Sequence, residues 1–207
     1  MSTAPVPAAV VRRRRLQLLL IAALFFGPLA LALFLYYGDT TPARSRTNHG
    51  QLIEPARALP RGGLASAAGA VPGEQPLRGT WSLVYITASH CDPGCLRALS
   101  DTRAVRLALG ADAGRVRRVL IVTAPCCASP LAAVRTDDKE LMTLWLEGAA
   151  GRELLALFPH AAQAVDEAGA VYLVDPRGNL LMRYPPGADP RGLLKDLERL
   201  LRLSQIG

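Results

Sequence analysis

Two cysteines, Cys91 and Cys95, stand four positions apart directly after a strongly apolar segment. That segment, residues 81–87, is rich in β-branched and aromatic side chains and is typical of a buried β-strand. Apolar residues then recur at helical spacing until Gly110, which predicts a helix that starts at about the second cysteine. Because the unpaired N–H groups at a helix N-terminus stabilise a thiolate, this arrangement predicts reactive thiols.

A pair of thiolates at this spacing supports two kinds of chemistry. Thiolates are soft ligands that suit Cu(I), and they also attack disulfide bonds. Disulfide exchange more commonly uses cysteines three positions apart. A purely stabilising disulfide is the alternative, but closing so short a loop removes little entropy from the unfolded chain, worth under about 3 kcal/mol. The sequence therefore predicts that Cys91 and Cys95 form a reactive dithiol, and it leaves copper binding and disulfide exchange both open.

The other two cysteines, Cys126 and Cys127, are adjacent and follow a second strand-like segment, residues 116–122. A helix between two such strands implies that the strands are parallel, so their C-terminal ends lie at the same edge of the sheet. We therefore expect all four cysteines on one rim. A disulfide between adjacent residues is strained, so we expect separate thiols here. Either one is a candidate resolving thiol or soft ligand, and simply filling a loop is an equally good interpretation.

Residues 16–37 form an apolar run in which Gln17 is the one strongly polar side chain. As a helix the run would be about 33 Å long, enough to cross the hydrocarbon core of a bilayer. Four arginines, Arg12 to Arg15, flank it, so the positive-inside rule keeps residues 1–15 in the cytoplasm and exports the rest of the chain. A cleaved signal peptide is the alternative, but the run is longer than such peptides usually carry. We therefore expect an uncleaved, single-pass transmembrane anchor.

Charge and composition indicate which kinds of partner the protein can bind. The 207 residues include 24 Lys and Arg against 17 Asp and Glu, a net charge of +7, and four of the basic residues are the arginines beside the expected anchor. Aromatic residues make up only 5% of the chain, which offers no platform for stacking bases. We therefore expect no nucleic-acid partner. All four cysteines lie in the part expected outside the cytoplasm, in a compartment where disulfides form.

Residues 38–75 are rich in Pro, Gly and Ala and are predicted to be a flexible linker, apart from an edge strand that residues 48–53 could add. The domain proper is expected over residues 76–207. Beyond the strand, helix and strand already described, the patterns predict a short strand, a short helix, a hairpin and an amphipathic helix over residues 141–146, 151–158, 170–184 and 189–203. This order, βαβ and then ββα, indicates an α/β fold of the thioredoxin-like class, with a central mixed sheet flanked by helices and one N-terminal transmembrane helix.

Taken together, these features make the chain resemble the Sco family of membrane-anchored, thioredoxin-like copper chaperones for cytochrome c oxidase assembly. The resemblance covers the anchor and about residues 75–205. It rests on the order and spacing of four pieces: Leu77-Arg78-Gly79, His90-Cys91 with Cys95, the prolines Pro125 and Pro130, and Tyr172-Leu173-Val174-Asp175-Pro176.

In that family copper is bound by the two motif cysteines and a distal histidine, and the resemblance carries the first two over to Cys91 and Cys95. The position of the histidine is occupied by Glu167, and the nearest histidine, His160, lies seven residues earlier. A carboxylate is a hard ligand for Cu(I), so either a cysteine of the second pair replaces the histidine or metal binding is weak or absent. The sequence also lacks the proline that thioredoxins carry before their third strand.

The resemblance implies a protein of the bacterial inner membrane whose periplasmic domain assists assembly of the copper centre of cytochrome c oxidase. An oxidase subunit or its assembly factors would be the partners, and copper the metal. The Cys91 and Cys95 dithiol would deliver Cu(I) or, if no metal binds, reduce disulfides, with Cys91 as the attacking and Cys95 as the resolving thiol. Two alternatives remain open: a general periplasmic thiol–disulfide oxidoreductase, and a non-catalytic assembly scaffold with a degenerate metal site.

Overall fold

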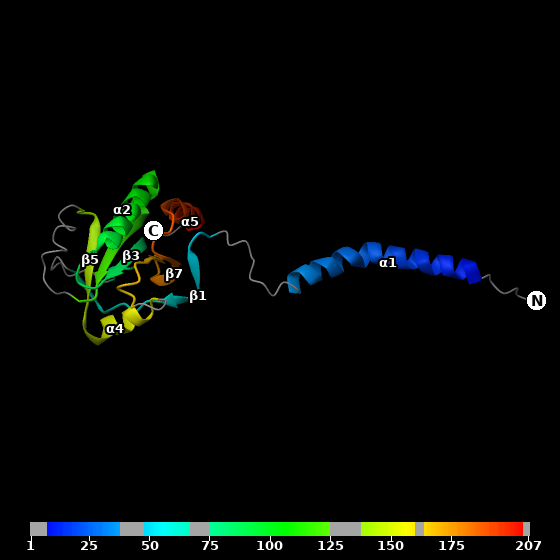
Figure 1. Cartoon of the computed structure of the whole chain (residues 1–207), viewed down its shortest axis with the longest axis horizontal. Helices are drawn as coiled ribbons and strands as arrows, with labels where there is room; N and C mark the ends of the chain where they lie inside the picture. The colour runs from blue at the N-terminus through cyan, green and yellow to red at the C-terminus, as the bar shows by residue number, and fades with distance from the viewer. Residues whose placement is uncertain (1–7, 38–47, 67–74, 125–137, 160–163, 205–207) are drawn as a thin grey trace, which may run out of the picture. The chain divides into compact units, whose positions relative to one another are not determined.

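The chain divides into two units, residues 1–46 and 47–207, and the computed structural model describes residues 8–37, 48–66, 75–124, 138–159 and 164–204. The first unit contains helix α1 (Ala8–Tyr37), drawn in blue in Figure 1. The leucine and phenylalanine side chains from Leu16 to Phe34 are exposed, Phe25 by 77%, so they require cover by lipid or protein. Among the described residues, α1 is the one helix long and apolar enough to cross a membrane, in its part from Arg12 to Leu31.

The second unit is built on one mixed sheet. Its strands are β1 (Gln51–Ala58), β2 (Leu64–Ser66), β3 (Trp81–Thr87), β4 (Val116–Val122), β5 (Leu141–Leu146), β6 (Val171–Val174) and β7 (Asn179–Tyr184). They lie in the order β1-β7-β6-β3-β4-β5-β2, with β3, β4 and β5 parallel and the other neighbouring pairs antiparallel. Strand β3, in the middle of this order, is buried along its whole length, as its β-branched and aromatic residues predict.

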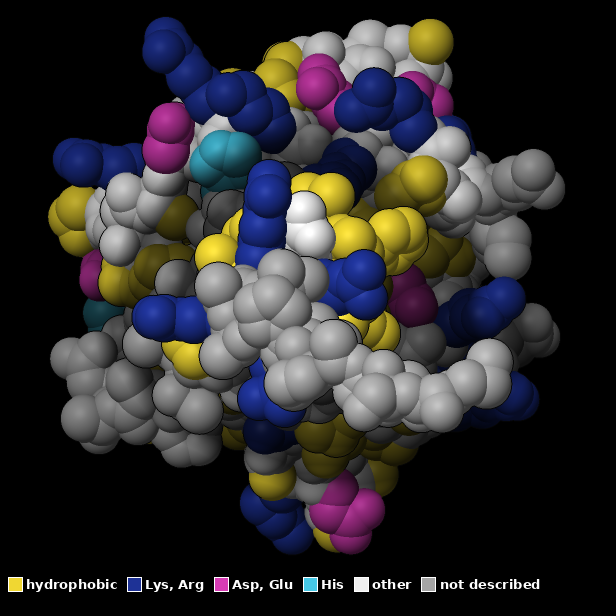
Figure 2. All heavy atoms as spheres, turned by 90° about the vertical axis from the view of Figure 1, so that its right-hand side faces the viewer, with side chains coloured by type: hydrophobic (Ala, Val, Ile, Leu, Met, Phe, Trp, Pro, Cys, Tyr) yellow, Lys and Arg dark blue, Asp and Glu magenta, His cyan; other side chains and the backbone are white. Residues whose placement is uncertain are grey.

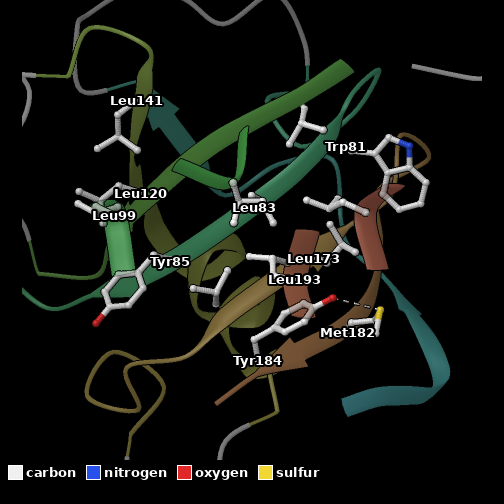
Figure 3. Packing of buried hydrophobic residues seen from close by; sticks show 14 of the residues in the cluster. Trp81, Leu83, Tyr85, Leu99, Leu120, Leu141, Leu173, Met182, Tyr184 and Leu193 are labelled. Atoms are coloured by element: carbon white, nitrogen blue, oxygen red, sulfur yellow. Dashed lines mark hydrogen bonds between the residues drawn. The ribbon is translucent and has the colours of Figure 1, made fainter. Parts of the chain in front are cut away.

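Helices cover both faces of the sheet. They are α2 (Pro93–Ala108), α4 (Gly148–Ala156) and α5 (Pro190–Leu203), with a short 3-10 helix, η1 (Gly110–Arg115), after α2. Because successive side chains of a strand point to opposite faces, the core falls into two clusters. Leu99 of α2 and Leu197 of α5 pack with Leu83 on one face, whereas Leu154 of α4 packs with Val84 on the other. Figure 1 shows α2 and α5 together on one side of the strands, and Figure 3 shows the first cluster from close by.

The segments predicted as the βαβ and ββα parts of the domain are all present. The connection from β3 through α2 to β4 joins parallel strands, with Tyr85 opposite Leu120, as expected for a helix between two strands. At the start of α5, Asp189 accepts a hydrogen bond of 2.9 Å from the backbone N–H of Arg191, and Pro190 is the first helical residue. The predicted mixed sheet flanked by helices is therefore confirmed.

The boundary expected between linker and domain is corrected by the structure. Residues 48–66 lie within the range assigned to a flexible linker, 38–75, but they contribute β1, which pairs with β7, and β2, which pairs with β5. The apolar side chains of Ile53 and Leu59 are buried in the core, which the Pro- and Gly-rich composition around them obscures. The edge strand expected from residues 48–53 is confirmed.

A buried carboxylate joins the two ends of the second unit. Asp196 of α5 is 4% exposed and accepts hydrogen bonds of 2.9 Å from the backbone N–H groups of His49 and Gly50 and of 3.0 Å from the Tyr184 hydroxyl. Gly50 carries no side chain where a Cβ would lie 2.7 Å from the Tyr184 ring, so the chain can approach this closely. We call these four residues the Asp196 cluster.

A second buried charge lies between β4 and α2. The Arg118 side chain is 1% exposed and donates hydrogen bonds of 2.7 Å to the backbone carbonyl of Leu99 and of 2.6 Å to the carboxylate of Asp138. A buried guanidinium is tolerated because it is paired and hydrogen-bonded. Through Arg118, the chain at Asp138 is thus held next to helix α2.

Both signs of charge are present on the surface. Figure 2 shows Lys and Arg side chains in dark blue over one face, with Asp and Glu side chains in magenta among them. One ion pair joins Arg115 and Asp112, whose charged atoms are 3.1 Å apart. Exposed pairs of this kind contribute about 0–1 kcal/mol each, so they are not what holds the fold together.

Candidate redox site

Helix α2 begins just after the first cysteine of the motif. Asp92 is its N-cap, and the Asp92 carboxylate accepts a hydrogen bond of 2.7 Å from the backbone N–H of Cys95. Pro93 follows at the first helical position, where its fixed φ fits and no N–H group is needed. The helix therefore starts two residues earlier than the second cysteine, with Cys91 just before it and Cys95 in its first turn.

Cys91 and Cys95 are joined in a disulfide, with their Cα atoms 5.1 Å apart. Their burial differs. Cys95 is 1% exposed and belongs to the core cluster on the α2 side of the sheet, whereas Cys91 packs against the edge of that cluster and is only partly buried. Because an exchange reaction requires the sulfur to be reached by a partner's sulfur, Cys91 is the one on which such a reaction can start.

The ends of β3 and β4 lie side by side next to this disulfide. The backbone N–H of Thr123 donates 3.0 Å to the carbonyl of Thr87, and that of Ala124 donates 3.2 Å to the carbonyl of Ala88. The chain thus leaves β4 toward the second cysteine pair directly beside the chain that leads to Cys91. Cys126 and Cys127 themselves, like His160, lie outside the described residues, so their place at the rim stays a prediction.

The position that the resemblance assigns to a histidine lies in the segment before β6. Glu167 is exposed there, and its neighbour Asp166 accepts a hydrogen bond of 2.6 Å from the Thr123 hydroxyl. This contact ties the segment before β6 to the end of β4. The two carboxylates are thus held at the same end of the sheet as the disulfide.

A cleft of about 530 Å³ opens beside the disulfide. One wall is the motif segment and the first turns of α2, with His90, Asp92, Arg97 and Asp101, and another is the segment that holds Glu167. The end of β7 and the start of α5 complete it. Of the residues predicted from the sequence, Glu167 lines the cleft, together with the chain neighbours of Cys91 and Cys95; the two cysteines themselves are not among the lining residues.

Tyr85 of β3 lies in the wall of this cleft and is 6% exposed. Burial, with a smaller contribution from the negative charge of Asp92, raises the pKa of Tyr85 to about 12. Within the described part of the chain its hydroxyl has no hydrogen-bond partner. Figure 3 shows this hydroxyl pointing away from the neighbouring core side chains.

The donor set around the disulfide is poor in metal ligands. Among the residues that the structure describes, no group of three or more His, Cys, Asp or Glu side chains is placed to hold a metal ion. Once the disulfide is reduced, Cys91 and Cys95 supply two soft ligands, and the nearby carboxylates are hard. A third soft ligand would have to come from outside the described ranges.

Sequence reasoning missed Tyr85, Asp92 and Asp101 as parts of the site. The signal for Asp92 was present, because Asp followed by Pro just before a helical pattern is an N-cap signature. For Tyr85 and Asp101 there was no such signal, since each lies within an element whose pattern indicates only packing. Their approach to one cleft depends on how β3, α2 and the segment before β6 meet.

A mixed sheet whose middle strand leads into a cysteine pair at a helix N-terminus defines a thioredoxin-like protein. The sequence agrees: residues 81–204 match the family described as the transmembrane-like, thioredoxin-like C-terminal domain, and residues 8–39 match its transmembrane-like N-terminal domain. The chain belongs to this transmembrane-like, thioredoxin-like family, and the predicted fold class is confirmed. The N-terminal match and the composition of α1 together indicate membrane anchoring.

Several solved structures with this fold are Sco proteins. ScoI of Bradyrhizobium japonicum with copper bound is 19% identical, with a TM-score of 0.53 over 69% of this chain and 98% of that one. Yeast Sco1 is 19% identical, with a TM-score of 0.59 over 73% of this chain and 98% of that one. BsSco, a Sco-family cytochrome c oxidase assembly protein with a disulfide switch, is 16% identical, with a TM-score of 0.54 over 74% and 99%.

Identities this low show a shared fold, and at that level the predicted resemblance to Sco proteins is confirmed. No curated protein sequence matches the chain.

Proposed function

We propose that this protein is a membrane-anchored, Sco-like thiol–disulfide reductant that assists assembly of the copper centre of cytochrome c oxidase. The observation that carries the proposal is the pairing of Cys91 with Cys95 at the start of α2, with Cys91 accessible and Cys95 buried. A disulfide that serves stability alone needs neither an accessible sulfur nor an open cleft beside it.

The reaction proceeds in two exchanges. In the reduced protein, the thiolate of Cys91 attacks one sulfur of a disulfide in the target, and the other target sulfur leaves as a thiolate and takes up a proton. Cys95, within bonding reach of Cys91, then attacks the mixed disulfide and releases the second target thiol. Two electrons pass to the target, and the Cys91–Cys95 disulfide that forms must be reduced again by another dithiol.

The start of α2 favours the first exchange. Cys91 lies next to the N-terminus of α2, where the positive end of the helix dipole stabilises a thiolate, while the Asp92 carboxylate takes up the N–H group of Cys95. Burial keeps Cys95 away from bulk solvent and foreign disulfides, so it reacts only with the mixed disulfide formed at Cys91. This division of roles supports Cys91 as the attacking and Cys95 as the resolving thiol.

Oxidase assembly is supported as the process by the proteins that share the fold. BsSco is a member of a family of cytochrome c oxidase assembly proteins and carries a disulfide switch. Our proposal gives the Cys91–Cys95 pair a corresponding role, in which it reduces cysteines that must be thiols before copper enters the oxidase. The partner is then an oxidase subunit or one of its assembly factors.

The location proposed for the domain follows from α1. Arg12 to Arg15 precede its apolar part, so the positive-inside rule keeps the N-terminus in the cytoplasm. Residues 47–207 then lie in the periplasm, outside the bacterial inner membrane. In that compartment disulfides form in target proteins and require reduction.

Copper delivery is a second candidate, favoured by the ScoI structures that contain copper. In this scheme Cu(I) is the cargo of the reduced Cys91 and Cys95. Glu167, at the position of the family's histidine, is a hard ligand that holds Cu(I) poorly. Cys126 and Cys127 are the soft ligands that this chain can add instead.

The reductant proposal is tested with the reduced full-length chain in detergent, mixed anaerobically with a peptide disulfide and analysed by mass spectrometry. We expect one peptide disulfide to be reduced for each Cys91–Cys95 disulfide formed. The Cys91→Ser variant should be inactive, and Cys95→Ser should accumulate the mixed disulfide. Wild-type protein that reduces the peptide no faster than Cys91→Ser would contradict the proposal.

Copper is tested on the same preparation by Cu(I) titration against a competing chelator. One-to-one binding of Cu(I) that Cys126→Ser or Cys127→Ser weakens would support a copper chaperone in which a cysteine replaces the family's histidine ligand. Binding no tighter than that of an unfolded dithiol would remove the copper role. If Cys91→Ser still supports oxidase assembly in cells, both chemical functions fail and a scaffold remains.

A further inference from the structure

The cleft beside the disulfide differs in charge from the chain as a whole. The chain is basic, with 24 Lys and Arg against 17 Asp and Glu. The residues that line the cleft include one guanidinium, Arg97, and four carboxylates: Asp92, Asp101, Asp166 and Glu167. An acidic lining in a basic protein attracts cations to this place against the net charge of the molecule.

Two of these carboxylates are available to a ligand. Asp92 already accepts from the backbone N–H of Cys95, and Asp166 accepts from a threonine hydroxyl. The carboxylates of Asp101 and Glu167 have no hydrogen-bond or ion-pair partner within the described ranges. Asp101 lies on α2 and Glu167 in the segment before β6, and both line the cleft.

Tyr85 provides an independent sign of a ligand. Its side chain is more than nine-tenths buried, yet its hydroxyl reaches the cleft and meets no partner in the described part of the chain. The hydroxyl oxygen itself is not a buried atom, so it is open to the cleft and can hydrogen-bond a polar group that enters there.

We propose that the cleft binds a Lys or Arg side chain of the target protein, one or two residues from the target's cysteine, and so selects disulfides flanked by a basic residue. This inference rests on the proposed reductant function, because it names the substrate of the same site. The Tyr85 hydroxyl accepts a hydrogen bond from the ammonium or guanidinium group, and Asp101 and Glu167 balance its charge. The apolar wall at Val171 and Leu193 packs against the methylene stem.

A basic side chain fits the cleft better than a metal ion does. A divalent cation needs several oxygen ligands that converge on one point, and the described residues contain no group of three His, Cys, Asp or Glu side chains placed in that way. An ammonium group needs only a few acceptors and a negative surrounding. The neighbourhood of Asp92 and Pro93, which belong both to the cleft wall and to the cysteine motif, brings such a side chain close to the reacting sulfur.

The first test measures binding without any reaction. Fluorescein-labelled peptides with serine in place of cysteine, and with Lys, Gln or Glu beside it, are titrated with the oxidised full-length chain in detergent and followed by anisotropy. We expect the Lys peptide to bind roughly fivefold more tightly than the Gln peptide, in line with partly exposed ion pairs. The preference should fall by roughly half or more in each of Glu167→Gln, Asp101→Asn and Tyr85→Phe.

Glu153→Gln is the matched control, because Glu153 is exposed on α4, on the other face of the sheet. It removes the same charge as Glu167→Gln from the same chain and should leave the preference unchanged. Equal affinities for the Lys, Gln and Glu peptides would overturn the inference. So would a preference that Glu153→Gln weakens as much as Glu167→Gln does.

The second test measures reduction of the corresponding peptide disulfides by the reduced protein. The rate constants should rank Lys, Gln and then Glu, the opposite of what the net charge of the chain predicts. Reduction at equal rates, with equal binding, would leave the reductant function and overturn the substrate preference. Binding that prefers Lys without any reduction would overturn the reductant function and keep the cleft as a cation site.

Discussion

Tyr85 and Tyr184 belong to the same core cluster and both reach the cleft, yet their hydroxyl groups have different surroundings. Tyr184 donates a hydrogen bond of 3.0 Å to the buried carboxylate of Asp196, and its oxygen lies 3.7 Å from the sulfur of Met182 (Figure 3). Tyr85 has no partner among the residues described. The Asp196 cluster is thus satisfied from within the protein, whereas the disulfide corner keeps polar groups free. The first arrangement holds the fold, and the second leaves room for a partner.

The largest effect is expected at the disulfide corner, and on reaction rather than stability. Cys91→Ser should reduce the exchange rate to the uncatalysed background, because the accessible nucleophile is gone. Peptide-disulfide reduction followed by mass spectrometry gives the rate, and urea unfolding under reducing conditions gives the stability. If reduced Cys91→Ser is much less stable than the reduced wild type, the disulfide corner also stabilises the fold, and its contrast with the Asp196 cluster is wrong.

In the Asp196 cluster the expected effect is on stability. Asp196→Asn removes a charged acceptor and places an amide opposite three N–H and O–H donors, so the free energy of unfolding should fall by about 3 kcal/mol. Urea denaturation measures it, with Glu153→Gln as the control, which should stay within about 0.5 kcal/mol of the wild type. If Asp196→Asn changes the free energy of unfolding no more than the control does, the Asp196 cluster does not stabilise the contact between the two ends of the second unit.

The two tyrosines allow the sharpest comparison, because the same substitution is made at both. Tyr184→Phe loses a hydrogen bond to a carboxylate and should destabilise the fold by about 1–2 kcal/mol. Tyr85→Phe loses no hydrogen bond within the described structure and should change stability by less than about 0.5 kcal/mol. Equal losses in chemical denaturation would show that the Tyr85 hydroxyl is also used by the fold.

The last comparison concerns the alkaline pH dependence of stability that Tyr85 contributes. Its pKa is about 12 in the folded protein and about 10 when unfolded, so folding favours the neutral phenol. That contribution to stability is fully present below pH 10 and is lost as the pH rises toward 12. Tyr85→Phe should therefore lose less stability than the wild type between these pH values. Urea unfolding at a series of alkaline pH values checks this, and parallel losses in both proteins would contradict it.

Local patterns in the sequence were enough to predict most of the fold. The strand before the cysteines, the helix after them, the hairpin and the Asp189–Pro190 start of α5 each depend on residues close together in the chain. What those patterns missed is set by distant contacts. Strand β2 and the part of β1 beyond residue 53 were hidden in a Pro- and Gly-rich range. The places of β1 and β2 at the two edges depend on partners late in the chain and in the middle.

The site was predicted in part for the same reason. The spacing of Cys91 and Cys95 at a helix start predicts a reactive dithiol; the structure joins the two cysteines in a disulfide, and their reactivity stays a prediction. The cleft depends on the approach of Asp101 and Glu167 from separate elements, which no local pattern records. In the sequence, Asp196 is one of several polar positions of an amphipathic helix, and nothing near it points to its partner His49, which lies 147 positions earlier.

The edge pairing of β1 with β7 has a consequence for the time course of synthesis. Gln51 stands opposite Arg183, 132 positions later in the chain. Ribosomes add about 5–20 residues per second, so β1 exists for on the order of ten seconds before its partner has been made. During that interval its N–H and C=O groups are open to other chains, and Glu54 and Arg57 place charges along the exposed strand. The sheet is completed where β7 pairs with β1, so the domain cannot finish folding until β7 has been synthesised.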